Sequence, residues 1–190
     1  MALKWKRRPQ GQHLELGISE NNLFLMLGAL GTSGDLFGET LVPVGTLYDT
    51  FISRGLDALH YAIYNGARFI LVGTPSGISL SPEGGLHQSL MPPAFGIESP
   101  RIAYYEPCFA RELEWILLDR VKRILEEPET ESLFLRLSTV EQPQELFPAD
   151  GSAELRRNVV SAFRCSLFAF GDLVSKSQGV ASGIERSHSR

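Results

Sequence analysis

The sequence predicts an α/β protein built as a parallel-sheet three-layer sandwich. Three short apolar runs, 69–72, 102–105 and 132–137, have the length and composition of strands that are buried on both faces. Segments with apolar residues at helical spacing alternate with these runs. Strands that alternate with helices indicate βαβ units, and such units form a parallel sheet with helices on both faces.

The first βαβ unit is expected between residues 41 and 72. Residues 41–44 predict a brief strand, and Thr46 or Asp49 is expected to cap the helix that follows. Asn65 and Gly66 are expected to end this helix in a left-handed turn. The apolar residues that define the helical spacing are Leu47, Phe51, Leu56, Leu59 and Ile63.

Three further segments complete the predicted elements. Ser19 is expected to cap a helix that reaches Leu27, with Glu20 in its first turn. Pro107 is expected in the first turn of a long helix. The apolar stripe of that helix comprises Phe109, Leu113, Ile116, Leu117, Val121 and Ile124. Residues 154–160 fit either a short helix or a short strand.

Composition divides the chain into three regions and bounds its function. Residues 1–10 form a basic N-terminal arm, 11–140 an α/β domain, and 141–190 a linker and tail of uncertain structure, expected to be disordered from 175 onward. The net charge of -4 argues against a nucleic-acid partner. The longest apolar stretch, 23–30, is too short to span a bilayer. Cys108 and Cys165 lie far apart, which favours free thiols and a cytoplasmic location.

The best indication of chemistry is the glycine-rich loop 73–88, which contains His87. The loop follows the strand at 69–72, and ligands of open α/β sheets bind beyond the carboxyl ends of the strands. A single histidine in a loop is nevertheless more often a surface residue than a catalytic one. By itself, the loop does not define a function.

Three other candidate residues each have an ordinary structural explanation. An acidic residue in a first helical turn, such as Glu20, is favoured by the unpaired amides and the helix dipole alone. Tyr48 and Phe51 share one face of a helix start, which usually indicates core packing. The same face is also suited to holding a flat ligand ring.

The order of these motifs resembles that of a known family. Residues 17–20, Pro43 with Tyr48 and Phe51, and segments 73–77 and 83–88 together resemble the pyrimidine-binding domain of the transketolase family of thiamine diphosphate enzymes. Within that family the chain is most similar to the homodimeric decarboxylating component of pyruvate and related 2-oxo acid dehydrogenases. The resemblance covers residues 11–140 and implies the thiamine diphosphate-binding fold of the pyrimidine-binding type.

The resemblance implies a role for each candidate. Glu20 matches the family glutamate that hydrogen-bonds a ring nitrogen of the aminopyrimidine, and a carboxyl there favours the ring tautomer that accepts the proton of the thiazolium carbon. Tyr48 and Phe51 match aromatic residues that pack against the pyrimidine. His87 matches a histidine that faces the thiazolium and polarises the substrate carbonyl. We therefore predict Glu20 and His87 as catalytic, and Glu20, Tyr48 and Phe51 as cofactor-binding.

The chain departs from the family pattern in several places. Residues 21–23 and 88–90 differ from those of pyruvate-specific relatives, so the substrate is left open. The family binds diphosphate and Mg²⁺ through a Gly-Asp-Gly motif on another domain, whereas Gly34 and Asp35 are followed here by Leu36. We expect Mg²⁺ to be held by a domain not present in this chain, and no metal ligand within it. The first strand and helix of the family domain are also expected to be missing, as is the family's C-terminal domain.

These observations give three functional hypotheses. The leading hypothesis is a fragment or split subunit of a thiamine diphosphate-dependent 2-oxo acid dehydrogenase, inactive without a diphosphate-binding domain or subunit. Such a chain is expected in a homo- or hetero-oligomer, with no nucleic-acid and no membrane partner. The alternative is a noncatalytic remnant or interaction module that retains the α/β fold. A generic nucleotide-binding domain is weaker, because no complete phosphate loop is present.

Overall fold

A computed structural model of the chain describes residues 10–89, 91–127, 130–148 and 151–161. Its centre is a four-stranded parallel sheet in the order β1-β2-β4-β3. The strands are β1 (Val44–Leu47), β2 (Ile70–Gly73), β3 (Ile102–Tyr105) and β4 (Ser132–Arg136). β2, β3 and β4 are buried along their whole length, as the predicted apolar runs required.

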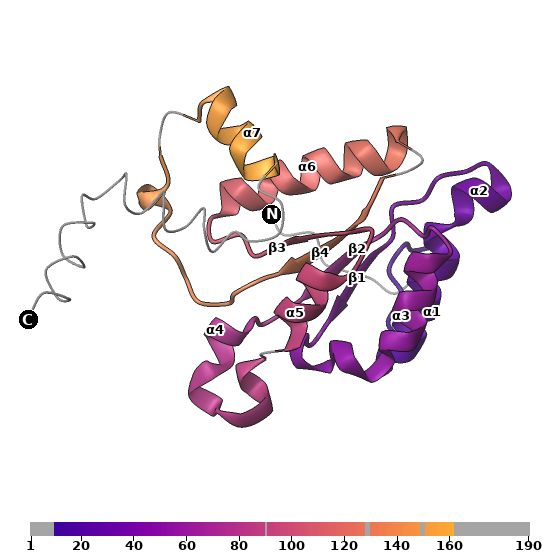
Figure 1. The fold of residues 1–190 in the computed structure, drawn as a ribbon, viewed down its shortest axis with the longest axis horizontal. Coiled ribbons are helices and arrows are strands. Elements are labelled where there is room, and N and C mark those ends of the chain that lie inside the picture. Colours follow the sequence, from indigo (N-terminus) through magenta and orange to yellow (C-terminus); the bar gives the residue numbers. More distant parts are fainter. Residues whose placement is uncertain (1–9, 90, 128–129, 149–150, 162–190) are drawn as a thin grey trace, which may run out of the picture.

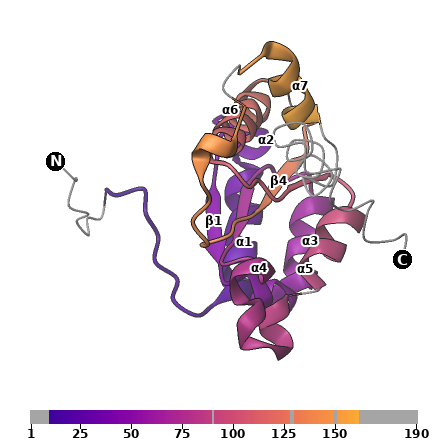
Figure 2. The ribbon, with the colours of Figure 1, turned by 90° about the vertical axis from the view of Figure 1, so that its left-hand side faces the viewer.

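Helices cover both faces of the sheet and complete the predicted three-layer sandwich (Figures 1 and 2). One face packs against α1 (Glu20–Gly31), α3 (Leu56–Tyr64) and α5 (Met91–Glu98). The other face packs against α6 (Ala110–Glu126) and α7 (Ala153–Ser161). Phe24, Leu59, Phe69 and Phe134 lie in the first core, and Ile124 and Leu133 in the second. The predicted fold class is confirmed.

Short helical segments form most of the connections. They are α2 (Ser33–Phe37), α4 (Gly77–Leu80) and four 3₁₀ turns at Asp49–Gly55, Ser81–Glu83, Gly85–Gln88 and Gln144–Leu146. The first 3₁₀ turn follows β1, and α4 with the next two turns follows β2. Both sets of turns therefore begin at the carboxyl edge of the sheet.

The predicted start of the first βαβ unit was wrong by three residues. β1 begins at Val44 because Pro43 has no N–H to donate, although its carbonyl accepts from the Ile70 N–H at 2.9 Å. Thr46 therefore lies inside the strand and caps nothing. Asp49 does not cap the helix either, because its carboxylate bonds the guanidinium of Arg136. The predicted left-handed end of α3 is confirmed at Gly66, whose φ is 77°.

The starts of the two long helices also differ in detail from the prediction. α6 begins at Ala110, so Pro107 lies ahead of its first turn. The Glu112 carboxylate fixes this start by accepting the N–H groups of Cys108 and Phe109 at 2.9 and 3.0 Å. α1 does begin after Ser19, but the serine hydroxyl accepts from the Asn22 side chain instead of a backbone amide.

Three described α-helices, α2, α4 and α5, were not predicted. α5 contains Pro92, Pro93 and Gly96, which weaken any helical pattern, although proline is tolerated in a first turn. Residues 154–160, for which helix and strand were both open, belong to α7. The tail predicted to be disordered, 175–190, lies outside the described residues.

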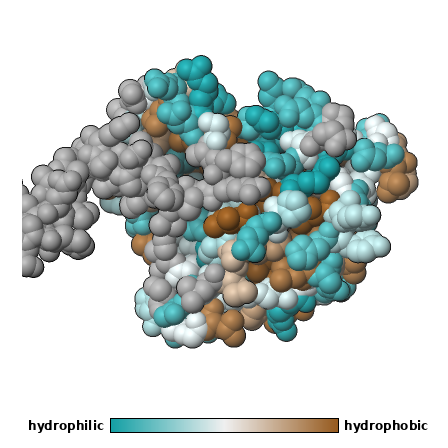
Figure 3. Space-filling model, in the orientation of Figure 1, coloured by the Kyte–Doolittle hydropathy of each residue, from teal (hydrophilic) through white to brown (hydrophobic). Residues whose placement is uncertain are grey.

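Apolar side chains reach the surface at the far end of the molecule from α4. Leu36 and Phe37 of α2 are 65% and 78% exposed, and the space-filling view shows apolar surface at that end (Figure 3). Patches of this kind mark contact surfaces more often than isolated exposed residues do. Within the described ranges, no helix is long and apolar enough to cross a membrane.

Candidate functional site

The candidate site lies at the carboxyl edge of the sheet, where two neighbouring strands end. β1 leads directly into Tyr48 and the 3₁₀ turn that contains Phe51. β2, its neighbour in the sheet, leads into the glycine-rich loop with His87. Parallel pairing aligns Leu47 with Gly73, so both connections leave the sheet at the same level.

A continuous run of contacts joins all four predicted site residues. The Glu20 carboxylate is 3.5 Å from the guanidinium of Arg54, which lies 4.7 Å from the centre of the Phe51 ring. The Phe51 ring meets the Tyr48 ring edge to face, with 4.9 Å between centroids. The Tyr48 hydroxyl is hydrogen-bonded to Nδ1 of His87 at 2.7 Å. The structure therefore brings the predicted residues together, although their roles stay predictions.

Glu20 reaches this run because α1 and the 3₁₀ turn are in close contact. A Cβ atom on Gly55 would lie 2.7 Å from the Phe24 ring and 3.0 Å from Cα of Asn21, so only glycine permits this approach. The Glu20 side chain is 12% exposed, whereas its partner Arg54 is 52% exposed. Such a half-exposed ion pair contributes little stability, and a ligand that bonds the carboxylate can displace it at small cost.

His87 lies at the other end of the run and faces two groups. Its Nδ1 is bonded to the Tyr48 hydroxyl and is 3.6 Å from the Glu83 carboxylate. Either the tyrosine hydroxyl donates to a bare Nδ1, or a protonated Nδ1 donates to the tyrosine oxygen. The His87 side chain is 46% exposed, so a molecule from solvent can reach it.

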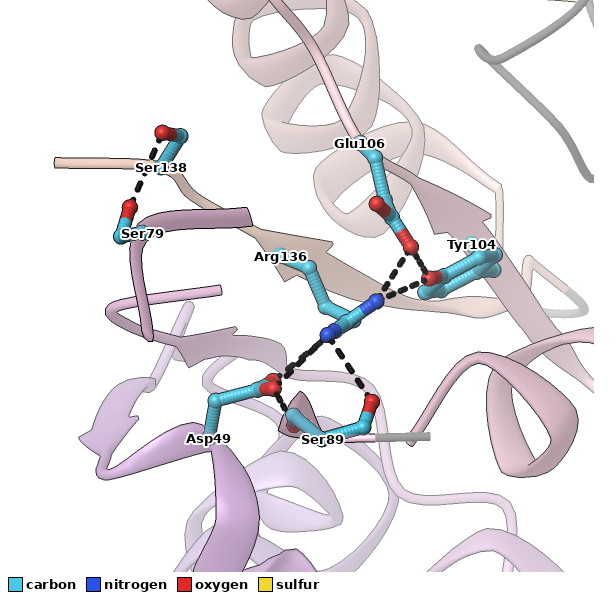
Figure 4. Close-up of polar contacts among 7 residues, drawn as sticks. All are labelled: Asp49, Ser79, Ser89, Tyr104, Glu106, Arg136 and Ser138. Atoms are coloured by element: carbon cyan, nitrogen blue, oxygen red, sulfur yellow. Dashed lines mark hydrogen bonds and ion pairs between the residues drawn. The ribbon is translucent and has the colours of Figure 1, made fainter. Parts of the chain in front are cut away.

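Beneath these residues lies a buried ion pair that the sequence analysis did not identify. The guanidinium of Arg136 donates to both carboxylate oxygens of Asp49, at 3.0 and 2.9 Å (Figure 4). It also donates to Glu106 at 2.5 Å, to the Tyr104 hydroxyl at 3.3 Å and to the Ser89 carbonyl at 3.3 Å. Charged groups from three strands thus meet at one edge of the sheet. Arg136 ends β4, whereas Asp49 and Glu106 lie just after β1 and β3.

The charges of this cluster support one another. Burial alone would lower the pKa of the Arg136 guanidinium, but its bonds to Asp49 and Glu106 outweigh burial and raise that pKa. The arginine is therefore a permanent cation under the site. The sequence held a signal for it, because Arg136 interrupts the apolar run 132–137 in a strand that should be buried. A charge at such a position needs a partner.

A second hollow lies at the N-terminus of α6, on the other side of the sheet edge. Its volume is about 270 Å³, and Cys108, Leu113 and Gln142 are among its lining residues. Burial, assisted by the negative charge of Glu112, raises the pKa of the Cys108 thiol and so disfavours the nucleophilic thiolate. The Ala110 N–H is bonded by the Gln144 side chain at 2.9 Å. This hollow is less suited to chemistry than the edge with His87.

Among the described residues, no three side chains of the His, Cys, Asp or Glu type gather as a metal site would require. The Gly34–Asp35 pair lies in α2, where the Asp35 carboxylate is 3.4 Å from the guanidinium of Arg68. Arg68 precedes β2, so this pair lies at the amino edge, away from His87.

The fold and the edge cluster define a class: a three-layer α/β domain with a polar, aromatic-lined site beyond the carboxyl ends of β1 and β2. Comparison with known proteins gives the family. Residues 2–145 match the pyruvate dehydrogenase E1 component middle domain, and the chain belongs to this family.

Individual relatives agree with this assignment. The chain is 29% identical over 145 residues to the pyruvate dehydrogenase E1 component of Mycolicibacterium smegmatis and 26% identical over 145 residues to that of Corynebacterium glutamicum. Each of these matches covers 75% of this chain and 16% of the relative. A third relative, from Cupriavidus necator, is 25% identical in an alignment 202 residues long that covers 95% of this chain and 22% of the relative. The chain thus spans less than a quarter of the length of these relatives.

Proposed function

We propose that this chain supplies the aminopyrimidine-binding half of a thiamine diphosphate site in a 2-oxo acid dehydrogenase of the pyruvate type. The observation that carries the proposal is the unbroken run of contacts from Glu20 through Phe51 and Tyr48 to His87. A carboxylate, an aromatic pair and an imidazole in this order are what a flat, basic ring next to a reacting carbonyl requires. Membership of the E1 middle-domain family supports the same reading.

The residues present fit the cofactor. Glu20 is mostly buried yet paired with an exposed cation, so its carboxylate is available to accept a hydrogen bond from a ring nitrogen. Phe51 and Tyr48 offer an apolar wall that excludes water and fixes the angle of a ring. Thiamine diphosphate, when bound, would supply a nucleophilic carbon for the 2-oxo acid carbonyl and an electron sink for the loss of CO2. In this proposal, His87 donates a hydrogen bond to the oxygen on which negative charge develops.

The other half of the site is proposed to come from a partner. In this proposal, a diphosphate-binding domain or subunit holds the diphosphate and Mg²⁺, and this chain is a fragment or split subunit that is inactive alone. The exposed Leu36 and Phe37 offer apolar surface for contact with another subunit.

Calorimetric titration tests the division directly. Thiamine diphosphate with Mg²⁺ is titrated into the chain alone and into the chain mixed with a diphosphate-binding domain of this family. We expect heat of binding only in the mixture. Glu20→Gln should weaken that binding at least about tenfold, because a charge-assisted hydrogen bond contributes about 1.5–3 kcal/mol.

The matched control is Glu114→Gln, which removes the same charge from the exposed face of α6 and should leave the affinity unchanged. Equal loss of affinity in both variants would show a general charge effect and remove Glu20 from the site. No binding with or without the partner would overturn the proposal and leave the noncatalytic module.

A further inference from the structure

The segment that carries His87 is long and largely exposed, yet its histidine meets Tyr48 closely. Residues 74–89 connect β2 to α5, and Glu83, Leu86 and His87 all face solvent. A loop of this length would ordinarily sample many positions. Something must hold it where the imidazole is 2.7 Å from the tyrosine oxygen.

The first end of the loop is tied to the segment that follows β4. The Ser76 N–H donates to the Leu137 carbonyl at 2.8 Å. The Ser79 and Ser138 hydroxyls are bonded at 3.0 Å, as Figure 4 shows, and Ser79 also accepts from the Thr139 N–H at 2.8 Å. These bonds fix the part of the loop that leaves the sheet, some eight residues before His87.

The far end of the loop is tied to the buried ion pair. The Ser89 hydroxyl donates to the Asp49 carboxylate, and Arg136 donates to the Ser89 carbonyl (Figure 4). Ser89 has a φ of 56°, an uncommon conformation for a residue with a side chain, so its contacts must hold it there. Asp49 directly follows Tyr48, and Ser89 lies two residues after His87. One ion pair therefore holds both partners of the Tyr48–His87 bond.

Two glycines permit this close arrangement. A Cβ atom on Gly73 would lie 2.5 Å from a carboxylate oxygen of Asp49. A Cβ atom on Gly77 would collide with the carbonyl oxygen of Gln88, the residue after His87. The two ends of the loop are thus packed against each other as well as against the ion pair.

We propose that Asp49 and Arg136 are positioning residues, whose buried pair, acting through Ser89, holds the imidazole of His87 against the Tyr48 hydroxyl. Asp49 is 0% exposed and Arg136 4%, so neither presents a surface to solvent in this structure. The catalytic meaning of this placement rests on the proposed function, but the placement itself is a property of this chain and is measurable without any cofactor.

The test is nitrogen NMR of the full chain labelled at the histidine rings. The shifts of Nδ1 and Nε2 report the hydrogen bond to Nδ1, and Tyr48→Phe gives the spectrum without it. Ser89→Ala removes one hydroxyl of the link, and Asp49→Asn removes its charge. In both variants we expect the His87 signals to move from the wild-type positions toward those of Tyr48→Phe.

Ser132→Ala is the matched control. Its hydroxyl is also buried and also joins two segments, donating to the Ala67 carbonyl at 2.8 Å, but it lies at the amino end of β4. This variant should lose stability to denaturant and keep the wild-type His87 signals. Unchanged His87 signals in a folded Ser89→Ala chain overturn the proposal, as does an equal shift in Ser132→Ala. If Asp49→Asn does not fold, Ser89→Ala alone decides. Cofactor binding that fails while the signals shift as expected would reject only the proposed function.

Discussion

Two of the three arginines buried among the described residues, Arg136 and Arg68, lie at opposite edges of the sheet and are equally hidden, each 4% exposed. Arg136 reaches Asp49 through two bonds and also bonds Glu106, Tyr104 and the Ser89 carbonyl. Arg68 meets the exposed Asp35 at 3.4 Å, and its Nε has no hydrogen-bond partner among the described residues. Equal burial therefore accompanies very different pairing.

The difference shows at which edge of the sheet a buried charge fixes the positions of its neighbours, and at which edge it is buried without doing so. A buried pair stabilises little by itself, because removing two ions from water costs about as much as their attraction returns. A buried pair does fix the relative position of its partners, since separating them would leave a buried charge without a partner. At the carboxyl edge, where Tyr48 and His87 meet, the ion pair of Arg136 fixes the segments around it. At the amino edge, Arg68 has fewer bonds and fixes its neighbours less.

Removal of Arg136 is the strongest test of the difference between the two arginines. Arg136→Met keeps most of the side-chain volume but leaves the fully buried Asp49 carboxylate without its cation. We expect the free energy of unfolding to fall by about 3–5 kcal/mol. Urea denaturation followed by circular dichroism measures this change. A loss below about 1 kcal/mol would show that water or another cation serves Asp49 equally well.

Another buried charge, Glu112, extends the comparison to a group whose hydrogen bonds come from backbone amides. Burial raises the pKa of its carboxyl, more than the N–H bonds from Phe109 and Cys108 lower it. The folded chain thus holds this proton more tightly than the unfolded chain does. Its contribution to stability is present below the ordinary glutamate pKa of about 4.3 and declines as the pH rises through the raised folded value.

Glu112→Gln cannot titrate and should lack this decline. The free energy of unfolding of the variant minus that of wild type should rise by on the order of 1 kcal/mol between about pH 4 and pH 7. Urea denaturation at several pH values gives the difference, from which carboxylates common to both chains cancel. Glu114→Gln, on the exposed face of the same helix, serves as the control. A difference that falls with increasing pH would mean that the two amide bonds outweigh burial.

Much of the fold follows from the sequence because its signals are local. The strands at 69–72, 102–105 and 132–137 were predicted within one residue. A strand buried on both faces is a run of apolar residues, and this run is visible in the sequence without knowing which strand lies beside it. The start of β1 was missed because it depends on pairing with β2. Pro43 can accept a hydrogen bond from that strand but has no N–H to donate to it. α5, with two prolines and a glycine, owes its helix to packing against the sheet.

The site divides in the same way. Glu20, Tyr48, Phe51 and His87 were predicted from the order of motifs, and the structure brings them into one run of contacts. Asp49 and Arg136 were missed, because a pairing across 87 positions of sequence is set by strand order alone. Once β4 lies beside β2 and β2 beside β1, their carboxyl ends converge and the two charges must meet.

The smallest expected effect is also the one that most sharpens the contrast between the arginines. Arg68→Met removes a buried cation whose Nε is already unpaired, and the Asp35 carboxylate that loses its partner is exposed enough to be solvated by water. We expect a change between zero and a gain of about 1 kcal/mol in the free energy of unfolding, against the large loss for Arg136→Met. The same denaturation experiment decides. A loss above about 2 kcal/mol would mean that the amino edge is as firmly specified as the carboxyl edge, and that burial alone, rather than the number of partners, determines what a buried arginine contributes here.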